Sequence, residues 1–390
     1  MFDMRNFLHP KRLTIAMWDG AYMTRRNSGD VFANWPRVID ELLERGYNTV
    51  RIDAFPSIID PNNLDLIHTW PDMHRPYMPW LWDRKYTTKP GRDLIEFLQL
   101  ANRKGLNVTL SSWWESSDLR VHPKNADEAT DLWIQLLDLI KREAGFDNIV
   151  FVDLCNEIPG FLPGYMKALD EAKFEKSQNS DHVTLDKPIA AAPPTGSSWN
   201  EHQLAFMRRT LDDSLAKAQE HFPELRFTYS MNMNTSFEQV GFQHLDVLDI
   251  HFFLTDERFD RRTGFNSEFI QKMFVTSEGF RNFSDRARAT IASVGPMLRQ
   301  KQREQLRWAK QFSDKIGAPL LTTEAWASWF YIDHPDLDWG WLLEWSEIAV
   351  DDAIEFGLWG MATNNYAEPM FELWKDVRWH RRLNERFLKG

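Results

Sequence analysis

The sequence contains one cysteine, Cys155, in 390 residues. A disulfide within the chain is therefore excluded, and a metal site built on thiolates is not expected. No apolar run approaches the ~20 residues that a membrane-spanning helix needs, so no membrane partner is predicted. The first residues lack a basic segment followed by an apolar one, so we expect no secretory signal. This predicts a cytoplasmic protein, or a secreted or periplasmic one if a leader has been removed.

Positive charge is also in short supply. The formal net charge is −11, and the acidic residues are spread along the chain rather than gathered in a tail. A nucleic-acid partner is therefore not expected. Tryptophan, in contrast, is abundant, with 18 residues. The flat apolar face and single N–H of an indole suit the faces of sugars, although a large core also uses many aromatic residues. The abundance hints at a carbohydrate partner.

Strand-like and helix-like segments alternate through the chain. Short apolar runs bounded by turn residues predict buried strands, and apolar residues at helical spacing that end at a glycine predict helices. The predicted strands are 13–18, 48–55, 106–110, 149–152, 226–230, 247–253, a run from 319 that ends at Glu324, and 358–363. Helices are predicted between them and after the last one.

Eight repeats of strand and helix predict an α/β protein in which a parallel sheet closes into a (β/α)8 TIM barrel. The alternative is an open doubly wound sheet, which usually carries a glycine-rich turn after its first strand. No such turn follows Trp18. No composition shift marks a domain boundary, so residues 1–390 are predicted to form a single domain.

Three connections are much longer than usual: residues 56–91, 158–200 and 254–298. All three follow strands, which places them on the face where TIM barrels carry their active sites. We expect them to wall a cleft or pocket, unless they are insertions without substrate contact.

Two of the predicted strands end in a glutamate. Glu157 follows the run 149–152 directly after Asn156, and Glu324 ends the strand that begins at Pro319. Two carboxylates on separate strand ends are the minimum apparatus for cleaving a glycosidic bond. Glu157 could instead be an ordinary acid in the first turn of a helix, favoured there by the helix dipole.

With these residues the chain resembles clan A glycoside hydrolases, nearest to the cellulase-like family 5. Asn156 and Glu157 resemble the clan's Asn and acid/base pair, and Glu324 resembles its nucleophile. Arg51 is similar to the strand-two arginine that pairs with the nucleophile, and His251 to the active-site histidine after strand six. Arg51 could instead balance Asp53, and His251 could be a core histidine.

Three family positions differ. Ser112, Trp113 and Trp114 stand where the family usually has a histidine, Phe253 replaces a tyrosine, and Tyr366 with the three residues before it replaces a tryptophan. Trp113, Trp114, Trp326 and Tyr366 are the candidate sugar contacts. Core packing is the alternative for these tryptophans and for Trp329.

The resemblance implies a retaining β-glycosidase without a cofactor. The two carboxyl groups should then lie about 5–5.5 Å apart. Glu324 would attack as an ionised carboxylate held by Arg51, while Glu157 would be protonated at rest and donate to the leaving oxygen. Asn156 would bind the sugar 2-hydroxyl.

Other functions remain open at this point. Asp53, Glu157, His251 and Glu324 all lie at predicted strand ends and could form an oxygen-rich divalent metal site of a hydrolase or isomerase. The barrel could also bind carbohydrate without cleaving it, or transfer the glycosyl group to a second sugar.

Overall fold

The fold was analysed in a computed structural model of the chain. It describes residues 10–71, 84–115, 122–162, 164–172, 199–233, 237–254, 257–263, 276–326 and 331–390. Trp329 and parts of the three long connections lie outside these ranges. Within them, no helix is both long and apolar enough to cross a membrane.

The centre of the molecule is a curled, parallel, nine-stranded sheet with the order β7-β6-β5-β2-β1-β11-β10-β9-β8. Its pairings are all parallel, as expected of strands joined through helices. The strands are β1 (Leu13–Asp19), β2 (Thr49–Asp53), β5 (Asn107–Ser111), β6 (Ile149–Asp153), β7 (Phe227–Thr228), β8 (Met231–Asn232), β9 (Leu248–His251), β10 (Leu320–Thr322) and β11 (Gly360–Ala362). The predicted fold class, a TIM-barrel-like α/β architecture, is therefore confirmed at this level.

The strongest sign of curling is contact between strands that are not neighbours. Phe151 of β6 and Trp359, just before β11, are separated by three intervening strands, yet their ring centroids lie 6.5 Å apart. They belong to a small buried cluster with Leu13, Val247 and Leu321. A flat sheet would hold these side chains far apart, so the sheet wraps around its own interior core.

The two edge strands are consecutive in the chain. The predicted strand 226–230 contains β7, which pairs with β6, and β8 begins directly after it and pairs with β9. Only Tyr229 and Ser230 separate them, so one stretch of chain borders both edges of the sheet.

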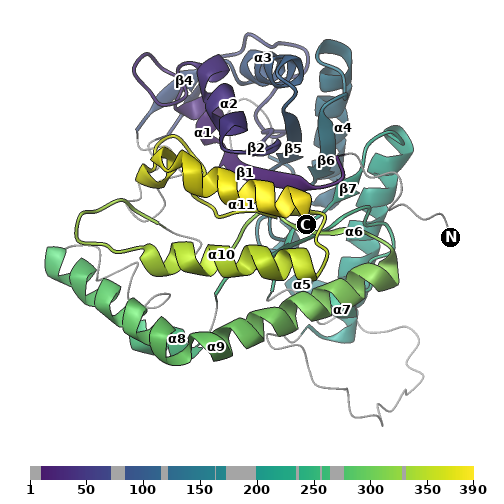
Figure 1. The fold of residues 1–390 in the computed structure, drawn as a ribbon. Helices are drawn as coiled ribbons and strands as arrows, with labels where there is room; N and C mark the ends of the chain where they lie inside the picture. Colours follow the sequence, from purple (N-terminus) through teal and green to yellow (C-terminus); the bar gives the residue numbers. More distant parts are fainter. Residues whose placement is uncertain are drawn as a thin grey trace, which may run out of the picture.

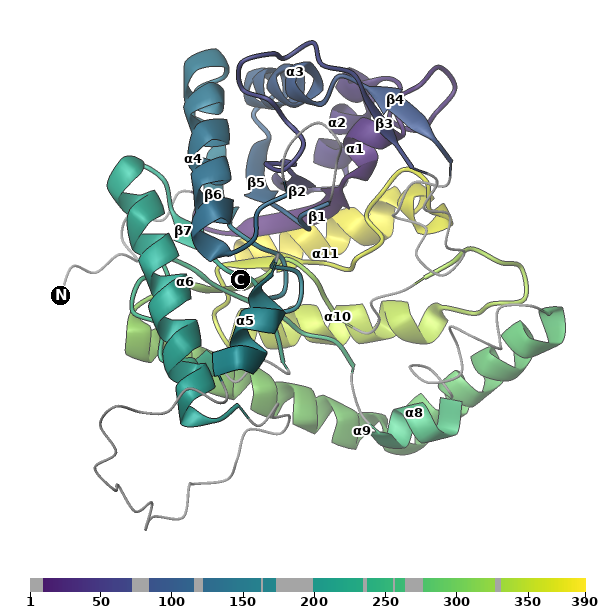
Figure 2. The ribbon, with the colours of Figure 1, turned by 180° about the vertical axis from the view of Figure 1, so that it is seen from behind.

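The helices surround the sheet on its outside, as Figures 1 and 2 show. They are α1 (Ala21–Thr24), α2 (Trp35–Glu44), α3 (Pro90–Arg103), α4 (Ala126–Glu143), α5 (Tyr165–Ala172), α6 (Glu201–His221), α7 (Phe237–Val240), α8 (Glu257–Thr263), α9 (Ser277–Ile316), α10 (Gly340–Glu355) and α11 (Val377–Lys389), with the 3-10 turn η3 (Glu372–Lys375). The long helices bury apolar residues at helical spacing, which is why all of them except the first part of α9 were predicted.

The long connections are less irregular than expected. The first contains an antiparallel hairpin, β3 (His68–Trp70) and β4 (Tyr86–Thr88), and the second contains α5. The third prediction, a loop over 254–298, is wrong at its end, because α9 begins at Ser277 and runs for 40 residues. Polar residues dominate this part of α9, so its helical signal was weak, and Pro296 lies inside the helix.

Candidate active site

The carboxyl ends of the strands bring the predicted catalytic residues together. Glu157 follows β6, Glu324 follows β10, and His251 ends β9. One side-chain oxygen from each glutamate and one ring nitrogen of His251 all lie within 4.8 Å of one another. Residues 94 and 73 positions apart in sequence are therefore held at one point, where two carboxylates can act on the same bond.

Arg51 of β2 binds Glu324. Its Nη1 donates to Glu324 Oε1 at 2.8 Å, and its Nε lies 3.4 Å from Asp19 Oδ1. Nη2 donates to Asn156 Oδ1. The side chain is 1% exposed, so this positive charge acts in a medium of low polarity. Burial would lower the pKa of Arg51, but Asp19 and Glu324 raise it, so the guanidinium stays charged.

His251 lies between the two glutamates. Its Nδ1 is 2.9 Å from Glu157 Oε1 and 3.7 Å from Glu324 Oε1. Burial acts to lower the pKa of His251, but the charge of Glu324 and the hydrogen bond to Glu157 raise it to about 9. At neutral pH the ring therefore carries a positive charge between two carboxylates.

The protonation of Glu157 differs from the expectation. Burial acts to raise the pKa of Glu157, but the hydrogen bond and charge of His251 lower it overall. Glu157 is thus a carboxylate at rest rather than a protonated acid. Burial also raises the pKa of Glu324, against the charges of His251 and Arg51. Arg51 donates to Glu324 Oε1 at 2.8 Å, and this charged hydrogen bond favours the carboxylate form of Glu324.

Two buried N–H groups at the site have no acceptor among the described residues. They are the amide nitrogen of Asn156 and the indole nitrogen of Trp326, both in residues that are 0% exposed. Trp326 stacks on Phe252 with the rings 14° from parallel. Buried donors are normally bonded, so these two are exceptions among the described residues around the cluster.

The other predicted sugar contacts fall into two groups. Trp113 is partly exposed, and its indole N–H donates to Asp19 Oδ2 at 3.1 Å. Trp114 and Tyr366 are buried in packing positions: Trp114 donates to the carbonyl of Leu154 at 3.1 Å, and Tyr366 stacks on Tyr331 at 4.4 Å. Their structural surroundings match the core-packing alternative more closely than a sugar platform.

Strained backbone marks the same face. Among the described residues, four that are not glycine have positive φ: Asp19 at 34°, Phe55 at 52°, Trp114 at 57° and Glu157 at 47°. All four lie at or just after the ends of β1, β2, β5 and β6. Such conformations are costly and gather where function requires a side chain in a particular place.

Asp53 does not join the cluster of acids as a metal ligand would. Its two carboxylate oxygens accept from the backbone N–H of Phe55 at 2.7 Å and of Trp113 at 2.9 Å. The remaining three residues, Glu157, His251 and Glu324, are close enough to share an ion. A divalent cation there would compete with the guanidinium of Arg51 for Glu324 and with the charged ring of His251. This arrangement favours a pair of reacting acids.

The sequence patterns missed several residues of the site. Asp19, the residue after the predicted strand 13–18, was not among the candidates, although it pairs with Arg51 and accepts from Trp113. Asn232 of β8 donates to Glu157 Oε2 at 3.4 Å. Asp249 and Thr323 form a hydrogen-bonded pair behind His251. Polar residues inside otherwise apolar strands were the available signal for Asp249.

Glu368, in the segment after β11, is a further missed acid. It is 0% exposed, and neither of its oxygens has a hydrogen-bond partner among the described residues. Burial raises its pKa well above the usual range, the charge of Arg25 opposes this, and that of Asp19 adds to it. The bond from Trp18 Nε1 to the carbonyl of Ala367, at 2.9 Å, holds this segment against β1.

Replacing Glu368 should change how stability depends on pH. The folded state binds the proton of Glu368 more tightly than the unfolded chain, so wild-type stability falls as pH rises above about 4.3. Glu368→Gln does not have this loss. We therefore expect its free energy of unfolding, relative to that of the wild type, to increase by about 1.4 kcal/mol per pH unit until Glu368 ionises in the folded wild type. Urea unfolding from pH 4 to 8 measures it. The matched control, Glu304→Gln on the exposed face of α9, should parallel the wild type. If the curves of both variants run parallel to that of the wild type, the pKa of Glu368 is not raised in the folded state.

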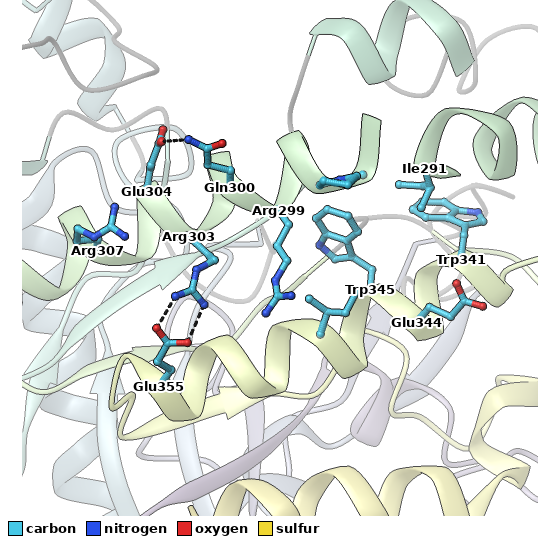
Figure 3. Close-up of a pocket in the computed structure, with 13 residues that line it drawn as sticks. Ile291, Arg299, Gln300, Arg303, Glu304, Arg307, Trp341, Glu344, Trp345 and Glu355 are labelled. Atoms are coloured by element: carbon cyan, nitrogen blue, oxygen red, sulfur yellow. Dashed lines mark hydrogen bonds and ion pairs between the residues drawn. The ribbon is translucent and has the colours of Figure 1, made fainter. Parts of the chain in front are cut away.

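A large cavity lies elsewhere, between α9 and α10 (Figure 3), with a volume of about 840 Å³. Two of its three arginines are paired: Arg303 with Glu355, and both Arg299 and Arg303 with the buried Asp352. None of the residues that line it is a predicted site residue. The cavity is part of a salt-bridged helix interface rather than of the cluster around Glu157.

Comparison with known proteins identifies the family of the chain. The family described as sugar-binding cellulase-like matches residues 15–388, so the chain belongs to the cellulase-like family. A Parabacteroides distasonis protein provisionally described as a glycoside hydrolase has a similar structure, with a TM-score of 0.78 and 25% identity over 97% of this chain and 93% of that one. The endoglucanase Cel5A of Thermotoga maritima shares the fold, with a TM-score of 0.52 and 11% identity over 96% of each chain. No curated protein matches the sequence.

The predicted resemblance to cellulase-like glycoside hydrolases is thus confirmed at the level of the family. The family assignment, the related structures and the clustered acids together support a carbohydrate-active protein.

Proposed function

We propose that the protein is a retaining β-glycoside hydrolase that acts on β-linked oligo- or polysaccharides, with Glu324 as nucleophile and Glu157 as acid/base. The observation that carries this proposal is the pair of carboxylates at the ends of β6 and β10, with oxygens within 4.8 Å of each other. Retaining glycosidases hold their two carboxyl groups about 5–5.5 Å apart, whereas inverting ones leave room for a water molecule between them.

The surroundings of the two acids support different roles. Glu324 is held by Arg51 as a carboxylate, the form that can attack an anomeric carbon, and it is 5% exposed. Glu157 is more accessible, with 18% of its side chain exposed, and it has a second oxygen that meets only the long 3.4 Å contact from Asn232. That oxygen can face a leaving group or an incoming water.

In the proposed reaction, Glu324 bonds to the anomeric carbon as the glycosidic oxygen leaves with a proton from Glu157. Because Glu157 is ionised at rest, it must gain that proton as substrate covers the site, and exclusion of water raises the pKa of a carboxyl group. Once the nucleophile is esterified, Glu157 returns as a base and removes a proton from water, which attacks the anomeric carbon and frees Glu324.

The unpaired donors supply the contacts to the sugar. The amide N–H of Asn156 is oriented by the bond that its oxygen accepts from Arg51, and we assign it to the 2-hydroxyl. The indole N–H of Trp326 and the partly exposed ring of Trp113 would line the same subsite. We further propose that the sheet closes as an eight-fold barrel within a single catalytic domain. The shared stretch β7–β8 at its two edges supports this closure.

A mechanism-based inhibitor tests the proposal directly. Activated 2-deoxy-2-fluoro β-glycosides of glucose, mannose and galactose, incubated with the protein, should add one fluoroglycosyl unit, seen by intact mass. Peptide mapping should place the adduct on Glu324. Proton NMR of products from the matching aryl β-glycosides should show the β-anomer first. A first-formed α-product would overturn retention. Carbohydrate binding detected by tryptophan fluorescence, with no turnover and no adduct, would instead support a binding barrel.

A further inference from the structure

A buried row of hydrogen bonds runs from β9 behind the reacting acids. Thr323 Oγ1 is 2.7 Å from Asp249 Oδ2 and 3.1 Å from His251 Nε2, and the opposite nitrogen, Nδ1, is 2.9 Å from Glu157 Oε1. Asp249, His251 and Thr323 are each 1% exposed. The row therefore connects a carboxylate that cannot touch substrate with the proposed acid/base.

The hydroxyl of Thr323 is fully used in this row. A threonine hydroxyl has one proton to donate and two lone pairs that accept. It accepts from Arg51 Nη1 at 3.1 Å, and Arg51 can only donate. Burial raises the pKa of Asp249, while the charges of His251 and Arg51 and the two hydrogen bonds from Thr323 oppose this and favour the carboxylate. As a carboxylate Asp249 can only accept, so the hydroxyl proton points to Asp249 Oδ2. The bond from His251 Nε2 must then be donated by the ring, which requires a proton on Nε2.

A second bond orients Asp249 for this task. The backbone N–H of Thr323 donates to Asp249 Oδ1 at 3.0 Å. One carboxylate therefore accepts hydrogen bonds from both the backbone and the hydroxyl of Thr323. Thr323 immediately precedes Glu324 in the chain. The direction of the hydroxyl is thus fixed by the fold, before any substrate is bound.

We propose that Asp249 is a positioning residue that, through the hydroxyl of Thr323, holds a proton on Nε2 of His251. With Nε2 occupied, the ring can donate from Nδ1 to the carboxylate of Glu157 only as an imidazolium with both nitrogens protonated. The row thereby places a positive charge between Glu157 and Glu324. Two carboxylates this close repel each other, and the imidazolium lets both stay ionised, as Glu324 must be to attack and Glu157 to act as a base.

The charged groups that face His251 are consistent with an imidazolium. Glu157 and Glu324 approach Nδ1, Asp249 lies behind Thr323, and the positive Arg51 bonds to Thr323 from the other side. Asp19 of β1 also interacts electrostatically with the ring. Carboxylates thus outnumber cations around it. The catalytic meaning of the row rests on the glycosidase function proposed above, but the proton position does not.

Nitrogen-15 NMR of histidine reads the proton position without any substrate. The chain has 11 histidines, so the signals of His251 are assigned by their loss in His251→Gln. In wild type at pH 7, both ring nitrogens of His251 should carry protons, and the ring should titrate near the value of about 9 that its neighbours impose. An unprotonated Nε2 at pH 7 would overturn the proposal.

Variants separate the hydroxyl from the general fold. Thr323→Val removes the acceptor for Nε2 but keeps the shape, so we expect the pKa of His251 to fall by at least about one unit. Thr323→Ser retains the hydroxyl and should retain the wild-type spectrum. The control, Thr228→Val, removes another buried hydroxyl, which bonds to the carbonyl of Val247, and should leave His251 unchanged. An unchanged spectrum in Thr323→Val would contradict the proposed role of the hydroxyl.

Asp249→Asn is the sharpest variant. The side-chain oxygen of the asparagine must accept from the backbone N–H of Thr323, so its NH₂ group points toward the hydroxyl of Thr323. The asparagine then donates to this hydroxyl, whereas Asp249 accepts from it. The hydroxyl then donates to Nε2, and His251 should become a neutral ring with its proton on Nδ1. If the wild type turns over aryl β-glycosides, kcat/KM should be about 10- to 100-fold lower in Asp249→Asn. The loss relative to wild type should be nearly as large for substrates with activated leaving groups. If His251 becomes neutral with its proton on Nδ1 in Asp249→Asn, but the wild type turns over no substrate, this inference is retained and the glycosidase function is rejected.

Discussion

Glu324→Ala should lose turnover of aryl β-glycosides by about 10⁴- to 10⁶-fold, the scale seen when a nucleophile is removed. The reason is geometric: Arg51 holds this carboxylate ionised beside the anomeric position, and no other described acid takes its place, because the second carboxylate of the cluster, Glu157, is bonded to His251. Initial rates with 4-nitrophenyl β-glycosides, at matched protein stability, measure the effect.

The stereochemistry of rescue identifies the role. Azide can occupy the space of the missing carboxylate in Glu324→Ala and attack the anomeric carbon once, so the product should be the α-glycosyl azide. Glu304→Ala, an exposed glutamate on α9, is the control and should keep wild-type rates. Because Arg51 retains Asp19 as a partner at 3.4 Å, the variant is expected to fold, and circular dichroism checks this. Activity retained in Glu324→Ala would falsify its assignment as nucleophile.

Glu157→Ala should show the second largest effect, and it should depend on the leaving group. A general acid or base contributes about 10²- to 10⁴-fold, so oligosaccharides, which need a proton on the leaving oxygen, should lose most. Activated aryl glycosides can still form the glycosyl enzyme, which then waits for a base. Azide needs no base, so it should restore turnover and give the β-glycosyl azide. Steady-state rates with and without azide, followed by NMR of the product, test this.

A matched change separates chemistry from backbone strain in this experiment. Glu157 has a φ of 47°, a conformation that alanine also adopts at some cost. Glu157→Gln keeps the side-chain shape and the bond to His251 but cannot give or take the proton. It should share the loss and, because its amide blocks the space, respond less to azide. Equal rescue of both variants, or an α-configured product, would count against Glu157 as the acid/base.

Much of the architecture was readable from local patterns. Apolar runs such as Ile149–Asp153 and helices that end at glycines, as at Gly317, are set by burial and by backbone conformation near each residue. The position of Glu157 and Glu324 after strands followed from the same runs. The start of α9 at Ser277 was not readable, because its polar stretch carries little apolar periodicity and is held by contacts with the rest of the chain.

The protonation state of Glu157 was the clearest failure of reasoning from sequence. Glu157 was expected to be neutral because Glu324 was the charge assumed to lie nearest to it. In the structure His251 is nearer, with Nδ1 at 2.9 Å, and its positive charge lowers the pKa of Glu157. Trp114 and Tyr366 show the same limit, since each directly follows a strand-end segment but packs into the interior.

The sequence by itself determined the class of fold, the acid pair and the resemblance to cellulase-like proteins, because apolar periodicity and short motifs depend on neighbouring residues. Only the tertiary structure decided which groups surround each acid. Arg51, Asn156, Asp249, His251 and Thr323 lie on or just after four strands, β2, β6, β9 and β10, that the curled sheet brings to one place. Charge and hydrogen bonding act over a few ångströms in space, and no sequence spacing encodes those distances.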